Sequence, residues 1–181
     1  EEVIGVARRM GITADLEPNL SLALGSSEVP MIQMAGAYAT IASGGYAIEP
    51  FGIKKIEEKE GGKVLYEHEN RSSPRVFRAQ DIQVLVNMMI SVVQNGTGQG
   101  AKSSFFAAGK TGTSQDHRDA WFDGFSQDYV AIVWFGNDDN TPMKRVTGGS
   151  LPARAWRDID AKAKYDPSPS RYKLIKDSSG S

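Results

Sequence analysis

The chain has 181 residues, of which 40% are hydrophobic and 24% are charged, and its formal net charge is -1. This composition is typical of a globular domain and argues against disorder, a collagen-like repeat or a coiled coil. A net charge near zero provides no general attraction for nucleic acid, so no nucleic-acid partner is expected. The absence of cysteine excludes disulfides, thiolate catalysis and cysteine-based zinc sites. No apolar run approaches the roughly 20 residues that a membrane-spanning helix needs.

The amino-terminal part of the chain predicts two helices joined by a loop. Residues 3–10 carry apolar side chains at helical spacing and precede Gly11, a common helix stop. Residues 12–25 predict the loop. Residues 26–30 predict the start of the second helix, because they combine hydroxyls for a cap, an acid for the helix dipole and a proline for the first turn. Two glycines at 44–45 are expected to end it.

The middle of the chain predicts a hairpin followed by a longer helix. Residues 52–68 contain two apolar arms around a turn at 60–62, and their many charges indicate a solvated ribbon. Residues 79–94 repeat apolar side chains at a spacing close to 3.6, which predicts a helix. The glycine-rich segment 95–100 is expected to end this helix.

The last part of the chain predicts a small sheet, a helix and a tail. Residues 104–111, 119–126 and 129–136 are short aromatic and β-branched runs, and their short connections favour an antiparallel meander. Residues 164–181 are polar and rich in proline and serine, and they predict a flexible tail. The final helix, 151–163, is expected to bury one side that comprises Leu151, Ala155, Trp156, Ile159 and Ala163.

This order of elements predicts an α+β fold over residues 1–163. Three strands alone bury too little apolar surface to be stable. The antiparallel sheet is therefore expected to be flanked by helices.

The strongest candidate for chemistry is the sequence G-K-T-G-T-S at residues 109–114, at the end of a predicted strand. Because Gly112 has no side chain, a peptide could approach the strand edge and add to it as a further strand. The two-residue period places the hydroxyls of Thr111 and Thr113 on one side, where they suit an anionic carboxylate. Strict alternation places Lys110 on the other side, so its participation requires an edge strand or a twist. The competing interpretation is an ordinary surface strand near a turn.

Other motifs in the chain give no cofactor or metal site. A phosphate-binding loop requires glycine at the position of Ser104, and residues 96–101 follow a helix and precede a strand, the reverse of the dinucleotide-binding order. His117 lies between charged residues but has no second histidine at a ligand spacing, which favours a solvated loop. Residues 138–140 lack the glycine and later glutamate of a calcium loop. No metal and no cofactor are therefore expected.

Several segments in one consistent order resemble the transpeptidase domain of penicillin-binding proteins, specifically the bifunctional class A kind. The resemblance runs from residue 1 to about 163 and is carried by residues 24–29, 37–39, 44–45, 108–114, 119–125 and 131–138. The K-T-G sequence belongs to the known motif set of this superfamily. The resemblance implies a partial β-lactamase/transpeptidase-like fold.

In this family, a serine in S-x-x-K attacks the penultimate D-Ala of a peptidoglycan stem peptide. The acyl group then passes to an amine of a neighbouring peptidoglycan strand. The resemblance implies that Lys110 polarises the site and assists proton transfer. It implies that the hydroxyls of Thr111 and Thr113 bind the terminal carboxylate of the peptide. The backbone N–H of Thr113 would be one oxyanion donor, an interaction worth roughly 3 kcal/mol in general. Gly112 and Ser114 complete the implied substrate-binding strand.

Two family motifs do not match as they should. S-x-N occurs nowhere in the chain, and the nucleophile motif is expected upstream of residue 1. Ser170 and Lys173 fit S-x-x-K by letters, but they follow the last predicted helix, so we interpret the match as chance. The chain starts neither with methionine nor with a signal peptide, which indicates a start inside a larger protein. The chain is therefore expected to be the carboxyl-terminal part of a transpeptidase domain and inactive by itself.

The parent protein is expected to be a serine-type D-Ala-D-Ala transpeptidase in cell-wall synthesis, at the periplasmic face of the bacterial inner membrane with an anchor outside this chain. Its expected partners are the stem peptide ending in D-Ala-D-Ala, β-lactam antibiotics and the upstream half of the same domain. The resemblance also implies hydrolase and carboxypeptidase activity and a link to antibiotic resistance. One alternative is a non-catalytic module that binds peptides or proteins. Another is a serine β-lactamase, which the tryptophan-rich meander and residues 25–27 disfavour.

Overall fold

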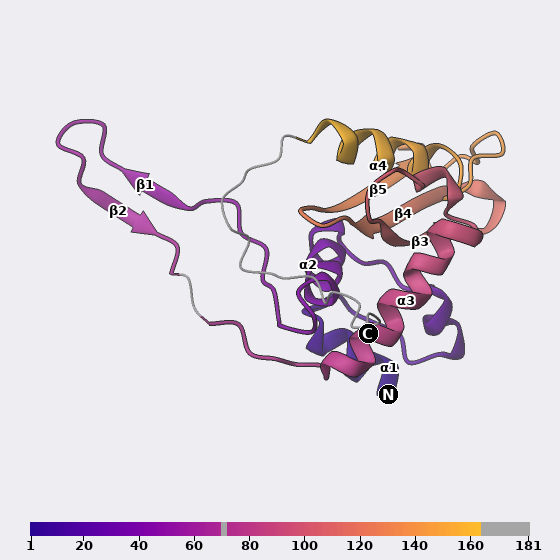
Figure 1. Cartoon of the computed structure of the whole chain (residues 1–181), viewed down its shortest axis with the longest axis horizontal. Helices are drawn as coiled ribbons and strands as arrows, with labels where there is room; N and C mark the ends of the chain where they lie inside the picture. Colours follow the sequence, from indigo (N-terminus) through magenta and orange to yellow (C-terminus); the bar gives the residue numbers. More distant parts are fainter. Residues whose placement is uncertain (70–71, 164–181) are drawn as a thin grey trace, which may run out of the picture.

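A computed structural model describes residues 1–69 and 72–163 of the chain, and it shows a three-stranded sheet with helices on both faces (Figure 1). A two-stranded hairpin projects away from this body. The predicted tail, including the Ser170 to Lys173 match, lies outside the described residues. No helix in the part of the chain that the structure describes is long and apolar enough to cross a membrane.

The sheet is the antiparallel meander that the sequence predicts. Its strands are β3 (Ala108–Thr113), β4 (Asp119–Phe125) and β5 (Val130–Gly136), in the spatial order β3-β4-β5. The first strand begins four residues later than residue 104, where it was predicted. Ala108 pairs with Phe125, and a turn follows Phe125, so residues before Ala108 have no strand opposite them.

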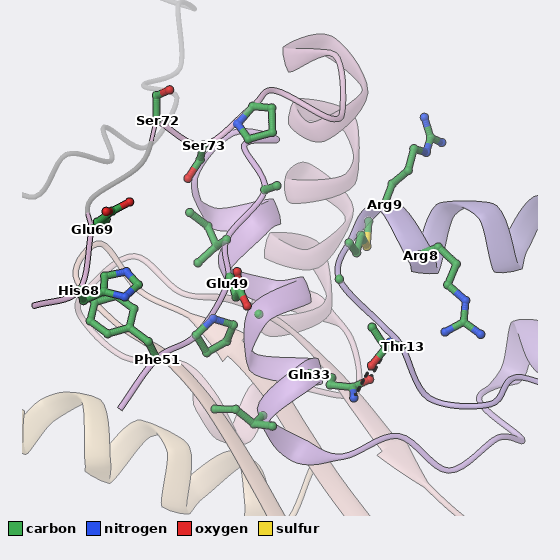
Figure 2. Close-up of a pocket in the computed structure, with 18 of the residues that line it drawn as sticks. Arg8, Arg9, Thr13, Gln33, Glu49, Phe51, His68, Glu69, Ser72 and Ser73 are labelled. Atoms are coloured by element: carbon green, nitrogen blue, oxygen red, sulfur yellow. Dashed lines mark hydrogen bonds between the residues drawn. The ribbon is translucent and has the colours of Figure 1, made fainter. Parts of the chain in front are cut away.

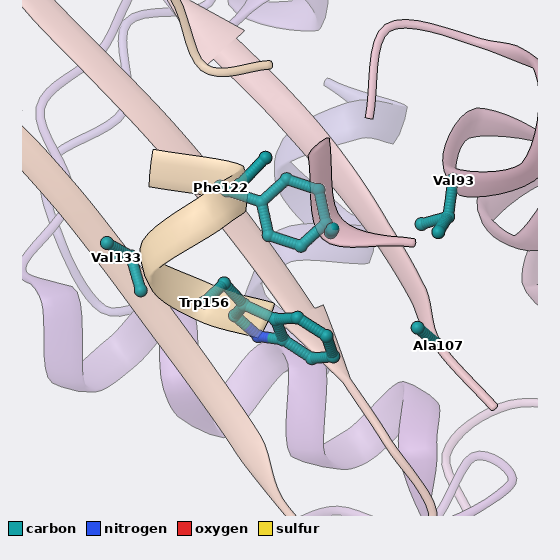
Figure 3. Close-up of a cluster of buried hydrophobic side chains, with 7 residues drawn as sticks. Val93, Ala107, Phe122, Val133 and Trp156 are labelled. Carbon is teal, nitrogen blue, oxygen red and sulfur yellow. The ribbon is translucent and has the colours of Figure 1, made fainter. Parts of the chain in front are cut away.

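One face of the sheet packs against α4 (Leu151–Lys162). Phe122 of β4 meets Trp156 of α4 edge to face, with ring centroids 5.4 Å apart and an angle of 60° between the rings (Figure 3). Both side chains are fully buried. The end of α3 (Ala79–Asn95) and the short helix η2 (Gln99–Ala101) close this core, which comprises Val93, Ala101, Ala107, Phe122, Val133, Ala153 and Trp156.

The opposite face of the sheet packs against α2 (Met31–Ala42) and the first part of α3. The buried side chains of this second core are Ile41, Ile82, Met89, Ala108 and Phe125. A smaller cluster joins α1 (Glu2–Arg9) to α2 through Ile12, Leu16 and Ala37, and the short helix η1 (Leu20–Leu24) lies in the connection. The fold is therefore α+β, with an antiparallel sheet between helices, as the sequence predicts.

Two details of the predicted helices are wrong. Pro30 occupies the cap position of α2 and no side chain caps this helix, because the predicted hydroxyls of Ser26 and Ser27 bind within the preceding loop instead. On α4, Leu151 and Ile159 are 46% and 52% exposed, so the buried stripe is narrower than predicted. It is shifted toward Pro152, Ala153 and Trp156.

The hairpin consists of β1 (Lys55–Glu57) and β2 (Val64–Glu67), and every residue of both strands is exposed. Ile56 pairs with Tyr66, and an irregularity follows in the register. At the base of the hairpin the rings of Phe51 and His68 stack with their centroids 3.6 Å apart. The predicted solvated ribbon is confirmed, and the ribbon contributes little to the core.

The contrast between two residues of α4 gives a test of this packing. Trp156→Ala removes a fully buried ring from the core beneath β4 and should lower the free energy of unfolding by about 3–5 kcal/mol. Leu151→Ala on the same helix removes an exposed side chain and should change it by less than about 1 kcal/mol. Urea denaturation followed by circular dichroism measures both. Equal losses for the two variants would contradict this placement of the core.

Candidate functional site

The predicted site segment lies on an edge of the described sheet. Within residues 1–69 and 72–163, β3 pairs with β4 on one side and with no strand on the other. The N–H of Ser114 donates to the carbonyl of Asp119, across the β3–β4 ladder. Because successive backbone groups point in opposite directions along a strand, the N–H of Thr113 points to the open edge. The strand therefore offers an unpaired backbone donor next to the K-T-G sequence.

The side chains of the K-T-G strand divide between the two faces of the sheet. Thr111 lies directly opposite Phe122, so it shares the face covered by α4. Lys110 lies opposite Asp123 and shares the face covered by α2. This is the alternation that the sequence predicts. The exposed Lys110 Nζ reaches back to donate a hydrogen bond to the carbonyl oxygen of Thr111, at 2.7 Å.

Both threonine hydroxyls are anchored by residues that sequence analysis did not select. The Oγ1 atoms of Thr111 and Thr97 are 2.6 Å apart, and either hydroxyl can donate. The N–H of Gly148 donates to Thr113 Oγ1 at 3.0 Å. Thr97 belongs to the glycine-rich segment that the sequence analysis considered for nucleotides, and Gly148 lies in the loop before α4. Their roles come from contacts across 14 and 35 residues, for which the sequence has no local signal.

The loop before α4 fits tightly against the site strand because it contains two glycines. A Cβ on Gly148 would lie 2.2 Å from the carbonyl oxygen of Trp121 and 2.6 Å from that of Gly112. A Cβ on Gly149 would lie 2.1 Å from the carbonyl oxygen of Thr97. Since real side chains do not come this close, only glycine allows the loop to lie on the backbone of β3 and β4 at position 148 and on that of Thr97 at position 149.

Ser114 and the turn after it close the end of the site strand. The Oγ of Ser114 accepts a hydrogen bond from the N–H of Asp119, at 2.7 Å. The ring Nδ1 of His117 lies 3.1 Å from the carbonyl oxygen of Val146, and His117 is half-buried. The sequence favoured a solvated loop for His117, whereas the structure attaches it to the loop before α4. Asp116 and His117 both have positive φ, at 60° and 57°, which is uncommon for residues other than glycine.

A buried carboxyl group lies across the ladder from Lys110. Asp123 is 7% exposed, and its Oδ1 has no hydrogen-bond partner within the described residues. Burial raises the pKa of Asp123 to about 7, although the positive charge of Lys110 acts in the opposite direction. Tyr38 of α2 is also affected, because burial and the Asp123 carboxylate both raise the pKa of its hydroxyl above the usual range. Sequence analysis did not identify Asp123.

A hollow in the structure, shown in Figure 2, has no residue of the K-T-G strand in its lining. It has a volume of about 1310 Å³ and lies between α1, α2 and the base of the hairpin. Arg8, Arg9, Gln33, Phe51 and His68 contribute to its lining, and no residue of 109–114 does. Among the described residues, no group of three or more His, Asp or Glu side chains is arranged to hold a metal ion. The hollow and the K-T-G strand are therefore separate features of the structure.

Comparison with known protein families gives a match over most of the chain. The family model described as the penicillin-binding protein transpeptidase domain matches residues 5–161. The chain therefore belongs to the penicillin-binding protein transpeptidase family.

The relatives are class A proteins, and they are much longer than this chain. Penicillin-binding protein 1A of Aquifex aeolicus is 38% identical over 160 residues, which cover 87% of this chain and 22% of the relative. Penicillin-binding protein 1A of Neisseria meningitidis serogroup A is 34% identical over 158 residues, which cover 83% of this chain and 20% of the relative. This chain thus spans about a fifth of their length.

A solved structure supports the fold. PonA1 of Mycobacterium tuberculosis, determined in complex with penicillin V, superposes with a TM-score of 0.73 at 22% sequence identity. The match covers 92% of this chain and 52% of the PonA1 chain. The arrangement of helices around the antiparallel sheet is therefore that of a penicillin-binding protein, present here in part.

The pH dependence of stability tests the buried carboxyl. Above pH 4 the unfolded chain has released the Asp123 proton, whereas the folded chain keeps it up to about pH 7. The contribution of Asp123 to the free energy of unfolding should therefore fall as pH rises from about 4 to 7, by at most about 1.4 kcal/mol per pH unit.

The Asp123→Asn variant cannot titrate at this position. Its stability relative to the unchanged chain should increase across that pH window, because the cost of ionising a buried group is removed. Lys110 and Tyr38 face the same group and stay in both proteins, so the difference isolates Asp123. Denaturant titrations between pH 3.5 and 8 measure it. If the free energies of unfolding of the two proteins changed in parallel with pH, a buried carboxyl with a raised pKa would be contradicted.

Proposed function

We propose that this chain is part of a peptidoglycan D,D-transpeptidase domain and contributes its K-T-G wall. One observation carries the proposal: β3 presents the outward N–H of Thr113, two anchored hydroxyls and the amine of Lys110 at one strand edge, in a member of this family. An extended peptide that ends in D-Ala-D-Ala would add along this edge as a further strand. Its terminal carboxylate would accept hydrogen bonds from Thr111 and Thr113.

Each residue of the strand has a distinct part in this proposal. Lys110 places a positive charge at the edge through its bond to the Thr111 carbonyl, and it would stabilise negative charge and assist proton transfer. The N–H of Thr113 would donate to the oxyanion that forms when the peptide carbonyl is attacked. Gly112 keeps the edge clear of side chains. Ser114 would hold the end of the substrate-binding strand in place, since its hydroxyl and its N–H both bond to the backbone of Asp119.

We further propose that the attacking serine comes from residues outside this chain. In the reaction, the serine Oγ bonds to the carbonyl carbon of the penultimate D-Ala, and the terminal D-Ala leaves as the amine. An amine on the stem peptide of a second peptidoglycan strand then attacks the same carbonyl carbon and displaces the serine. A β-lactam would acylate the same serine through opening of its ring, in line with the penicillin V complex of PonA1. The site would lie on the periplasmic face of the membrane, where peptidoglycan is assembled. Release of the acyl group to water would give carboxypeptidase activity.

A non-catalytic peptide-binding module is the second candidate. The open edge of β3 and the anchored hydroxyls favour it as much as they favour the enzyme, because both functions need the same edge for binding. The two functions differ in acylation. A binding module would take up the peptide without any covalent step.

The first test uses the 181-residue chain itself. The chain should not be covalently labelled by a fluorescent penicillin, because the K-T-G wall binds but does not attack. Labelling is measured by fluorescence on a denaturing gel, with a complete class A penicillin-binding protein as the positive control. A stable acyl adduct on any residue of the chain, Ser170 included, would overturn this part of the proposal.

The second test changes the proposed carboxylate donor in a protein that joins this chain to a segment carrying the S-x-x-K serine. Thr113→Ala removes a hydroxyl whose hydrogen bond to a carboxylate is worth about 1.5–3 kcal/mol, so acylation by penicillin should slow by about ten- to a hundredfold. Stopped-flow or gel-based acylation rates measure the change.

Thr113→Ser is the matched control, because it keeps the hydroxyl and should keep most of the rate. An unchanged rate in Thr113→Ala would remove Thr113 from the site. Complete absence of acylation in the unchanged protein would favour the binding module.

A further inference from the structure

Thr97 makes a contact that neither the fold nor the K-T-G motif requires. It lies outside the site strand and is exposed to solvent, yet its Oγ1 is 2.6 Å from the Oγ1 of Thr111. An exposed threonine whose hydroxyl is directed at another hydroxyl gains little for stability, because water can satisfy both groups. The contact places a third hydroxyl beside the two that the proposed function assigns to the peptide carboxylate.

The backbone of Thr97 is held from two sides. The N–H groups of Gly96 and Gly98 both donate to the carbonyl oxygen of Val92, at 3.1 and 3.0 Å, which folds the segment tightly onto the end of α3. A Cβ on Gly149 would meet the Thr97 carbonyl oxygen at 2.1 Å, so the loop before α4 lies directly against it. These close approaches fix the backbone of Thr97 relative to β3, and the contact with Thr111 directs its exposed side chain.

The protons of these hydroxyls can be counted. Thr97 and Thr111 have two hydroxyl protons between them, and their mutual hydrogen bond uses one, whichever residue donates. The other proton stays free to donate outward. Thr113 accepts from the Gly148 N–H, so its own proton is also free. The cluster thus offers two hydroxyl donors, the number that the two oxygens of one carboxylate require.

We propose that Thr97 is a positioning residue of the carboxylate subsite, which it completes by orienting the Thr111 hydroxyl toward the bound carboxylate. This inference rests on the proposed transpeptidase function and adds a residue outside the K-T-G strand to its specificity for acidic ligands. Without Thr97, the Thr111 hydroxyl rotates freely and must be ordered when the ligand binds. The effect should therefore appear in reactions of ligands that carry the carboxylate.

The test uses the same joined protein and two ligands, benzylpenicillin and its methyl ester, which lacks the negative charge at the carboxylate. Thr97→Val keeps the shape of the side chain and removes the hydroxyl. It should lower the second-order rate of acylation by benzylpenicillin about tenfold, the effect of losing one well-oriented hydrogen bond. The rate with the ester, which is lower already in the unchanged protein, should change by less than about twofold.

Three further variants separate positioning from a structural effect. Thr97→Ser keeps the hydroxyl and should restore the benzylpenicillin rate to within about threefold of the unchanged protein. Thr97→Ala should reproduce the loss seen with Thr97→Val. Thr13→Val is the matched control, because Thr13 is also an exposed threonine that loses one side-chain hydrogen bond, the 2.9 Å bond from Gln33, and it lies between α1 and α2. It should leave both rates unchanged.

The outcomes distinguish this inference from the function on which it rests. If the unchanged protein is acylated and Thr97→Val slows both ligands equally, or slows neither, Thr97 does not act through the carboxylate. If the unchanged protein is not acylated by benzylpenicillin at all, the proposed transpeptidase function fails, and the inference fails with it. The positioning role would be established if the ratio of the acylation rates with benzylpenicillin and with its methyl ester falls in Thr97→Val and is restored in Thr97→Ser.

Discussion

The contact between Phe122 and Trp156 determines how the site strand is oriented. Phe122 lies opposite Thr111 in the β3–β4 ladder, and its burial under α4 fixes which face of the sheet this register position occupies. A shift of one residue between β3 and β4 would pair Thr111 with a residue of the other face, so Thr111 and Thr113 would leave the face on which Phe122 is buried. The aromatic pair thus keeps both hydroxyls on the side where Thr97 and Gly148 can reach them.

The packing of α4 on β4 also explains why the loop before α4 contains glycine. Once α4 is packed on β4, the loop that leads into it must cross the backbone of Gly112 and Trp121 at close range. Gly148 makes this crossing possible, and its N–H then donates a hydrogen bond to Thr113. Packing in the core and the orientation of a surface hydroxyl are therefore connected through one loop.

The sequence predicted the parts of this arrangement that depend on local patterns. The meander, the hairpin, the last two long helices and the division of Lys110 from Thr111 follow from periodicity, turns and alternation. The contacts of Thr97 and Gly148 could not be predicted, because they join loops that are distant in the chain and need the assembled core. The predicted cap of α2 was wrong for a similar reason. The hydroxyls of Ser26 and Ser27 form hydrogen bonds within the preceding loop, which no local pattern describes.

The two faces of β3 supply different chemistry to one edge. On the α4 face the polar groups are neutral hydroxyls held by neighbours, so they can bind an anion without changing their own charge. On the α2 face Lys110 lies opposite a carboxyl group whose pKa burial raises to about 7. Near neutral pH the Asp123 carboxyl is protonated in part of the molecules. In those molecules it is neutral and does not compensate the positive charge of Lys110. The edge of the strand therefore combines neutral hydroxyls on one side with a side whose net charge depends on pH.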